Sequence, residues 1–149
     1  MAEPQLNSDP GREVTLAEAM TVRDAIRSER HVGFTVVSGS MEPVIMTGSL
    51  IEVEPLESID ELRTFDIILF WNGKRLICHY LWHINQLPGA DGARIIITRP
   101  LAPKDGEDQP VPTAHVLGRI VSHRIPFWRR ARIIFRKRFK EARRGVLSG

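Results

Sequence analysis

Two serines and a glycine occupy a short turn that could hold a nucleophile. Residues 38–43 read Ser-Gly-Ser-Met-Glu-Pro and lie between the apolar runs Phe34–Val37 and Leu50–Val53. Glycine adopts backbone conformations that other residues resist, so the turn can present the Ser40 hydroxyl beside backbone N–H groups. Acyl transfer needs both, because the attacked carbonyl oxygen becomes an oxyanion. The Ser40 N–H and the Ser38 hydroxyl are the candidate oxyanion donors.

A serine hydroxyl is a weak nucleophile near neutral pH and needs a general base within hydrogen-bond reach. Lys74 and His79 are the candidates, and both lie in or next to the strand expected at Arg75–Trp82. Histidine titrates near neutrality, whereas lysine has to be desolvated before it can act as a base. His79 is therefore the preferred base for Ser40. A histidine accommodated on a half-buried strand is the alternative interpretation.

The turn at residues 38–43 resembles the nucleophile box of the signal peptidase I family and of the related self-cleaving domains of SOS-type repressors. Further matches are Asp66–Phe70, His79-Tyr80, Ile97–Arg99 and Gly118-Arg119, so that the resemblance covers about Val36 to Val121. It implies a mainly β fold with a signal peptidase-like barrel or ribbon core. It also implies a serine endopeptidase with a histidine base, which cleaves an extended, signal- or leader-like peptide or preprotein.

The same resemblance implies an acid that orients the histidine. Pro100-Leu101 stands where the family has Gly-Asp, so the first family acid is absent. Asp108 fits the position of a second family acid, and Asp105 is a fallback. The expected catalytic residues are therefore Ser40, His79 and Asp108. For Asp108, a solvated carboxylate without a catalytic role, in an acidic loop, is an equally good interpretation. A peptidase fold that binds peptide without efficient catalysis is the alternative function, since Tyr80 also replaces the family arginine.

Three segments are expected along the chain. Residues 1–30 comprise a disordered lead to about residue 13 and a helix that starts at the capping box Thr15–Glu18. Residues 31–125 form the catalytic domain of short strands, and Asn72-Gly73 is expected at the centre of a type I′ hairpin turn. Residues 126–149 form a basic amphipathic helix. Pro100–Pro112 reads as a loop.

Composition limits the number of domains, the kinds of metal or disulfide site and the cellular location that are expected. A chain of 149 residues corresponds to one principal domain, and the single cysteine, Cys78, excludes an internal disulfide and a multi-cysteine metal site. No metal or cofactor is expected. No run of about 18 apolar residues and no N-terminal signal pattern is present, so a cytoplasmic or membrane-peripheral location is expected.

Charge is strongly polarised. Residues 119–149 hold eleven Lys and Arg and one acid, a balance of +10, whereas residues 1–118 hold ten Lys and Arg and seventeen acids, a balance of −7. Aromatic and aliphatic residues recur at helical spacing among these cations, which favours contact of residues 127–144 with an anionic membrane surface. A helix that covers its own core is the alternative. Nucleic acid is not an expected partner, because about thirty residues before the turn cannot hold a helix-turn-helix domain.

Overall fold

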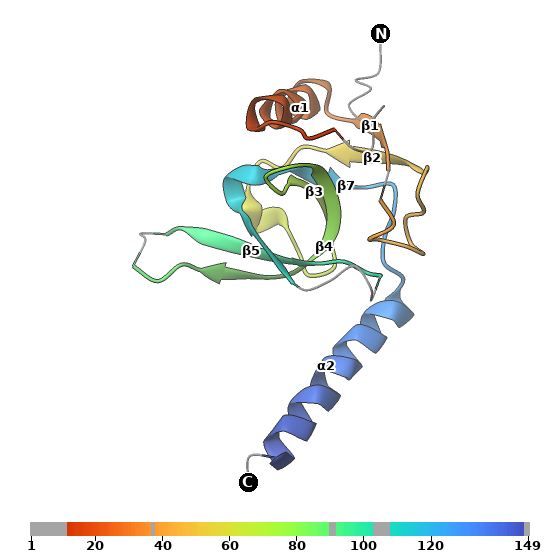
Figure 1. The fold of residues 1–149 in the computed structure, drawn as a ribbon, viewed down its shortest axis with the longest axis vertical. Coiled ribbons are helices and arrows are strands. Elements are labelled where there is room, and N and C mark those ends of the chain that lie inside the picture. The colour runs from red at the N-terminus through yellow and green to blue at the C-terminus, as the bar shows by residue number, and fades with distance from the viewer. Residues whose placement is uncertain (1–11, 37, 90–91, 103–107, 148–149) are drawn as a thin grey trace.

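The computed structural model describes residues 12–147 apart from 37, 90–91 and 103–107 (Figure 1). Most of the expected disordered lead, Val37 of the first expected strand and the fallback acid Asp105 lie outside the described residues.

Within the described residues, the protein is mainly β, with one seven-stranded antiparallel sheet and two α-helices. The strands follow the order β1-β2-β7-β3-β4-β5-β6 across the sheet. Their bounds are β1 Val32–Thr35, β2 Leu50–Glu54, β3 Ile67–Trp71, β4 Leu76–Gln86, β5 Arg94–Arg99, β6 Gln109–Pro112 and β7 Val116–Ile120. The two short 3-10 turns are η1 Ile59–Glu61 and η3 Thr113–His115. The β-branched and aromatic runs of the sequence therefore form strands as predicted.

Strand β6 corrects the expected loop at Pro100–Pro112. Its residues pair with β5 from Ile95↔Pro112 to Thr98↔Gln109, although two of its four residues are prolines. Proline cannot donate a hydrogen bond to a neighbouring strand, but β6 is the last strand of the sheet and has a neighbour on one side only. The prolines made the segment look like a loop, and the edge position tolerates them.

Strands β3 and β4 form an antiparallel hairpin as predicted, but the register differs: Trp71 lies opposite Leu76, whereas a turn centred on Asn72-Gly73 would place it opposite Lys74. The Asn72 N–H donates to the Arg75 carbonyl at 3.0 Å, so Gly73-Lys74 occupies the centre of the turn, and the expectation of Asn72-Gly73 there is wrong. The Asn72 side chain is the physical reason: its Oδ1 accepts from the backbone N–H groups of Lys74 and Arg75, at 2.9 and 2.8 Å. Gly73 alone takes a positive φ, of 100°.

The two faces of the sheet bury two separate clusters. Since successive side chains of a strand point to opposite faces, Cys78, Tyr80 and Trp82 of β4 join the first cluster, while Leu81 joins the second. The first cluster also contains Met41 from the serine turn. The second cluster consists of Leu62, Ile68, Phe70, Leu81, Ile96, Val111 and Val116.

Helix α1, Leu16–Glu29, lies against β1, β2 and β7 (Figure 1). Its capping box forms as predicted: Thr15 Oγ1 accepts from the Glu18 N–H at 3.2 Å, and Glu18 Oε2 accepts from the Thr15 N–H at 3.0 Å. Ala19, Val22 and Ile26 are buried on one side of the helix and join the first cluster.

Helix α2, Phe127–Leu147, carries the chain away from α1 toward the opposite end of the molecule (Figure 1). Its Ile133 packs against the first cluster, and the Lys137 Nζ lies 5.1 Å from the centre of the Trp82 ring. Among the described residues, neither helix is both long enough and apolar enough to cross a membrane.

Candidate functional site

The serine turn connects β1 to β2 and is closed by local hydrogen bonds. The Val36 N–H donates to the Ser49 carbonyl at 3.0 Å, and the Gly48 N–H donates to the Val36 carbonyl at 2.7 Å. Inside this closed loop, the Glu42 carboxylate accepts from the N–H and the hydroxyl of Thr47 at 3.3 and 3.1 Å. The charged side chain after Met41 therefore ties the two halves of the turn together and fixes the place of Ser40.

The Ser40 hydroxyl lies against strand β4. Its Oγ donates to the Cys78 carbonyl at 3.3 Å and is 3.2 Å from the Ser38 Oγ. Ser40 is 9% exposed, whereas Ser38 is exposed to solvent. The turn thus brings Ser40 next to the residue that precedes His79, with the Ser38 hydroxyl beside it.

The carbonyl of Ser40 is held from the other side by the segment that follows β5. The backbone N–H groups of Leu101 and Ala102 donate to this one carbonyl oxygen at 2.8 and 3.0 Å. Leu101 occupies the position at which the resemblance would place an acid, so this position does reach the serine turn, but through its backbone. Within the described part of the chain, no acceptor is hydrogen-bonded to the Ser40 N–H.

His79 is buried on β4, with 5% of its surface exposed. Its Nδ1 lies 3.4 Å from the Thr98 Oγ1, and its ring packs edge-on against Phe70 at a centroid distance of 5.5 Å. These contacts put the imidazole on the face of the second cluster, whereas Cys78 and Tyr80 face the first cluster. The structure therefore brings Ser40 to the strand that carries His79, but the acceptor of the Ser40 hydroxyl is the Cys78 carbonyl.

Asp108 pairs with Arg99. Its two carboxylate oxygens accept from the Nε and Nη2 of Arg99, at 2.5 and 3.0 Å. The Arg99 guanidinium in turn stacks over the Trp82 ring at 4.1 Å. Both oxygens of the Asp108 carboxylate are thus engaged with Arg99, and Thr98 is a side chain that contacts the His79 Nδ1.

Two other groups near the site are poor candidates for chemistry. Burial raises the pKa of the Cys78 thiol to about 12, so it stays protonated and inert near neutral pH. Lys74 is exposed in the β3–β4 turn, as predicted, and is therefore solvated. Among the described residues, no group of three or more His, Cys, Asp or Glu side chains could hold a metal ion.

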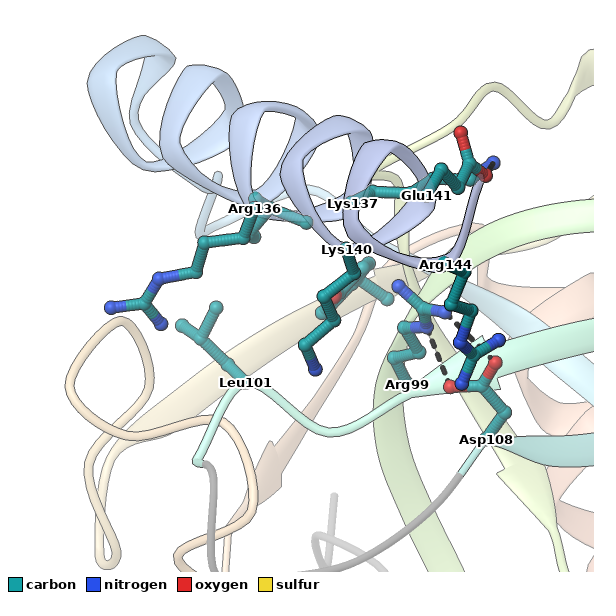
Figure 2. A pocket seen from close by; sticks show the side chains of 10 residues that line it. Arg99, Leu101, Asp108, Arg136, Lys137, Lys140, Glu141 and Arg144 are labelled. Carbon is teal, nitrogen blue, oxygen red and sulfur yellow. Dashed lines mark hydrogen bonds and ion pairs between the residues drawn. The ribbon is translucent and has the colours of Figure 1, made fainter. Parts of the chain in front are cut away.

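A small apolar pocket of about 30 Å³ adjoins the Ser38 side of the turn. It is lined by residues of β1, β3 and β4 and by the start of the turn: Phe34, Thr35, Val36, Ser38, Leu69, Leu76 and Cys78. Its size restricts it to a small side chain. A second, larger hollow of about 510 Å³ lies between α2, the middle of β4 at Tyr80 and the end of β5 at Arg99 (Figure 2).

Comparisons of the chain with known families, proteins and structures found no match. No protein-family model matches the chain, and no curated protein or solved structure is detectably similar to it. The arguments about function therefore rest on the residues and geometry of this chain.

The sequence did not identify Thr98 and the backbone of Leu101 as parts of the site. Thr98 is fully buried, and its hydroxyl also donates to the Gln109 carbonyl of β6 at 3.0 Å. A threonine at an alternating position of a β run gives no signal of such a role, because it is an ordinary strand residue. The hydrogen bonds from the Leu101 and Ala102 N–H groups to the Ser40 carbonyl depend on how the chain turns after β5. Side-chain patterns in the sequence do not encode that turn.

Proposed function

We propose that this protein is a serine endopeptidase of the signal peptidase I-like type, in which Ser40 is the nucleophile and His79 the general base. The observation that carries the proposal is the position of the Ser40 hydroxyl, 3.3 Å from the carbonyl of the residue before His79 and 3.2 Å from the Ser38 hydroxyl. Catalytic hydrogen bonds often form only in the substrate complex. In this structure the imidazole lies against Thr98 and Phe70 on the face of the second cluster, so the mechanism requires it to move from that face to the Ser40 hydroxyl when a peptide binds.

The reaction would proceed in two steps. The Ser40 Oγ forms a bond to the substrate carbonyl carbon while its proton passes to His79, and His79 returns this proton to the departing amine. Water then hydrolyses the resulting ester, again with His79 as the base. During both steps the Ser40 N–H and the Ser38 hydroxyl would hold the oxyanion.

The small pocket beside Ser38 supports a preference for small side chains near the scissile bond. Its volume of about 30 Å³ and its apolar lining suit an alanine-sized group better than a branched or charged one. A peptide bound in an extended conformation would place alternate side chains on this face. Peptides with an Ala-x-Ala sequence, as in signal- or leader-like segments of preproteins, are the expected substrates.

A serine-reactive acylating probe, such as a fluorophosphonate, tests this proposal directly. Wild-type protein is expected to be labelled on Ser40, and labelling should disappear in Ser40→Ala and fall strongly in His79→Ala. Ser28→Ala, which removes an exposed serine of α1, is the matched control and should be labelled like the wild type. Labelling that survives in Ser40→Ala, or absence of labelling together with no cleavage of an Ala-x-Ala peptide panel, would overturn the proposal.

A peptide-binding module without catalysis is the second candidate. It is favoured by the bond of the Ser40 hydroxyl to a carbonyl and by the engagement of both Asp108 oxygens with Arg99. This candidate predicts peptide binding of equal strength in wild type and Ser40→Ala, with no acylation of either. The probe experiment separates the two candidates.

We further propose that α2 attaches the protein to anionic membrane surfaces. The side of α2 that faces the sheet carries Ile133 and Lys137, while the aromatic side chains on its other side are exposed: Phe127 84%, Trp128 54%, Phe135 70% and Phe139 54%. An amphipathic helix whose apolar side points to solvent is suited to insertion into a membrane interface. The flanking arginines would meet acidic head groups.

A further inference from the structure

The hollow between α2 and the sheet carries a strong excess of positive charge. Five cationic side chains line it, from Arg99 on β5 and from four positions of α2: Arg136, Lys137, Lys140 and Arg144. Only two carboxylates, Asp108 and Glu141, line it as well, which leaves an excess of three positive charges. The apolar side chains of Tyr80, Leu101 and Ile133 complete the lining. A concave site of this charge favours an anionic ligand.

The two carboxylates do not offset the cations that stand nearest to Leu101. Asp108 is engaged with Arg99, and Glu141 lies 3.8 Å from the Nζ of Lys137, one turn earlier on the helix. Arg136 and Lys140 reach from α2 to either side of Leu101 in Figure 2. Their charge therefore adds to the pocket at the place where the pocket borders the β5–β6 segment.

Leu101 connects this part of the pocket directly to the serine turn. Leu101 lines the pocket with its side chain and donates its N–H to the Ser40 carbonyl at 2.8 Å. Along β4, Leu76 and Cys78 line the small apolar pocket, while Tyr80 lines the basic one. Cys78 and Tyr80 are two residues apart, about 7 Å along a strand. The two pockets thus lie on either side of the point where the Ser40 hydroxyl meets β4.

We infer that the basic pocket, defined by Arg99, Arg136, Lys137, Lys140 and Arg144, binds acidic side chains of the peptide substrate. This inference rests on the proposed peptidase function and specifies its substrate class. The preferred peptide carries a small residue on one side of the scissile bond and Asp or Glu residues on the other side, within a few positions. Lysine and arginine side chains on a helix adapt to such carboxylates without a fixed geometry, and they also accelerate the encounter by long-range attraction.

Binding to the Ser40→Ala protein tests the inference without requiring turnover. Three fluorescent peptides share an Ala-x-Ala core and differ only in one flanking dipeptide, which is Asp-Glu, Ser-Gln or Lys-Lys. A second set carries the same dipeptides on the other end of the core. Each peptide is titrated with the protein, and binding is followed by fluorescence anisotropy. The acidic peptide is expected to bind about 10-fold more tightly than the neutral one and to lose this advantage at high salt. For one of the two flank positions, the acidic peptide is expected to bind most tightly, the neutral peptide less tightly and the basic peptide most weakly.

Charge reversal locates the effect. Arg136→Glu combined with Lys140→Glu, in the Ser40→Ala background, should remove the preference for the acidic flank and leave the affinity for the neutral peptide within about 2-fold. Arg138→Glu, on the same helix but outside the pocket lining, is the matched control and should keep the preference. Circular dichroism of each variant checks that α2 remains helical.

The outcomes separate the inference from the proposed function. Charge-dependent binding that the pocket variant abolishes supports the inference even if no peptide is cleaved, in which case the peptidase proposal alone fails. The inference is overturned if the peptides are cleaved but bind with equal affinity whatever their flank. It is also overturned if Arg138→Glu loses the preference for the acidic flank as fully as the pocket variant does. Displacement of all three peptides alike by a short-chain anionic phospholipid, but not by inorganic phosphate, would assign the pocket to a lipid head group and also overturn it.

Discussion

The backbone N–H of Leu101 donates to the carbonyl oxygen of Ser40 at 2.8 Å, and this bond joins the segment after β5 to the serine turn. The Ala102 N–H reinforces it on the same oxygen at 3.0 Å. Since the Ser40 hydroxyl is bonded to Cys78 of β4, one serine connects the turn to two neighbouring strands. The same segment borders the basic pocket, so Leu101 links the position of Ser40 to this pocket.

Ser38 is expected to support catalysis without supporting binding. Its hydroxyl lies 3.2 Å from the Ser40 Oγ, and the residue is exposed to solvent. Loss of one oxyanion donor typically costs about 3 kcal/mol in the transition state. Ser38→Ala should therefore lower kcat for an Ala-x-Ala peptide about 100-fold with little change in KM. Ser28→Ala should be unchanged, and an equal loss in kcat and in substrate affinity would contradict the assigned role.

Thr98 is expected to act as a positioning residue for His79. Its hydroxyl lies 3.4 Å from the His79 Nδ1 and donates to the Gln109 carbonyl at 3.0 Å. Thr98→Val keeps the shape but removes the hydroxyl, so kcat should fall about 10-fold and the acidic limb of the pH–rate profile should move. Thr98→Ser keeps the hydroxyl and should restore both. If valine and serine behave alike, the threonine acts only through packing.

The Cys78 thiol predicts a loss of stability at alkaline pH. Burial raises its pKa from 9.0 to about 12, so between these values the unfolded chain releases a proton that the folded protein retains. A raised acid pKa stabilises the fold fully below pH 9.0, and that contribution declines as pH rises toward 12, by about 1.4 kcal/mol for each pH unit. Urea unfolding of wild type and Cys78→Ala at pH 8 and pH 10.5 measures this. The variant should lose less stability over the interval, and equal losses would show that another group is responsible.

Gly118 is expected to be required for the contact between β7 and β2. A Cβ added there would lie 2.6 Å from both the Glu54 carbonyl oxygen and the Val53 Cγ1, too close for any rotamer to relieve. Gly118→Ala should lower the free energy of unfolding by about 1–3 kcal/mol. Gly145→Ala on α2 meets nothing within 4 Å, and it should be neutral or slightly stabilising because alanine favours a helix. Similar effects of the two substitutions in urea unfolding would contradict this account.

The sequence predicted most of the fold because its strands are locally encoded. The β-branched runs, the capping box at Thr15 and the antiparallel pairing of β3 with β4 each depend on residues close together in the chain. The shift of the turn at Asn72 depends on one side-chain amide, and strand β6 depends on its place at the edge of the sheet. Local patterns do not contain that information.

The site was predicted less completely than the fold. Position 40 and the strand that carries His79 meet as expected, but which face of β4 the imidazole occupies follows from strand register, and a shift of one residue reverses it. Asp108 pairs with Arg99, a partner that neither spacing nor composition indicates. Prediction of the residue types was easier than prediction of their orientation.

The exposed side of α2 is expected to bind anionic membranes. Arg129 and Arg132 stack on Trp128 at 4.6 and 5.5 Å, and Arg143 stacks on Phe139 at 5.1 Å, so the cations flank the apolar surface. Aromatic rings would enter the interface while each arginine contributes about 1 kcal/mol near acidic lipids. Sedimentation with vesicles that contain phosphatidylglycerol should recover the protein, whereas phosphatidylcholine vesicles should not.

Point variants test whether this apolar surface is the part of the protein that binds. Phe135→Ser combined with Phe139→Ser should reduce recovery with anionic vesicles by at least 10-fold, since two large apolar side chains are lost from the interface. Leu87→Ser removes a 41% exposed apolar side chain outside α2 and should bind like the wild type. Binding that is unaffected by the double substitution but abolished by salt would mean that the arginines act alone, at the surface of the membrane and without insertion of α2.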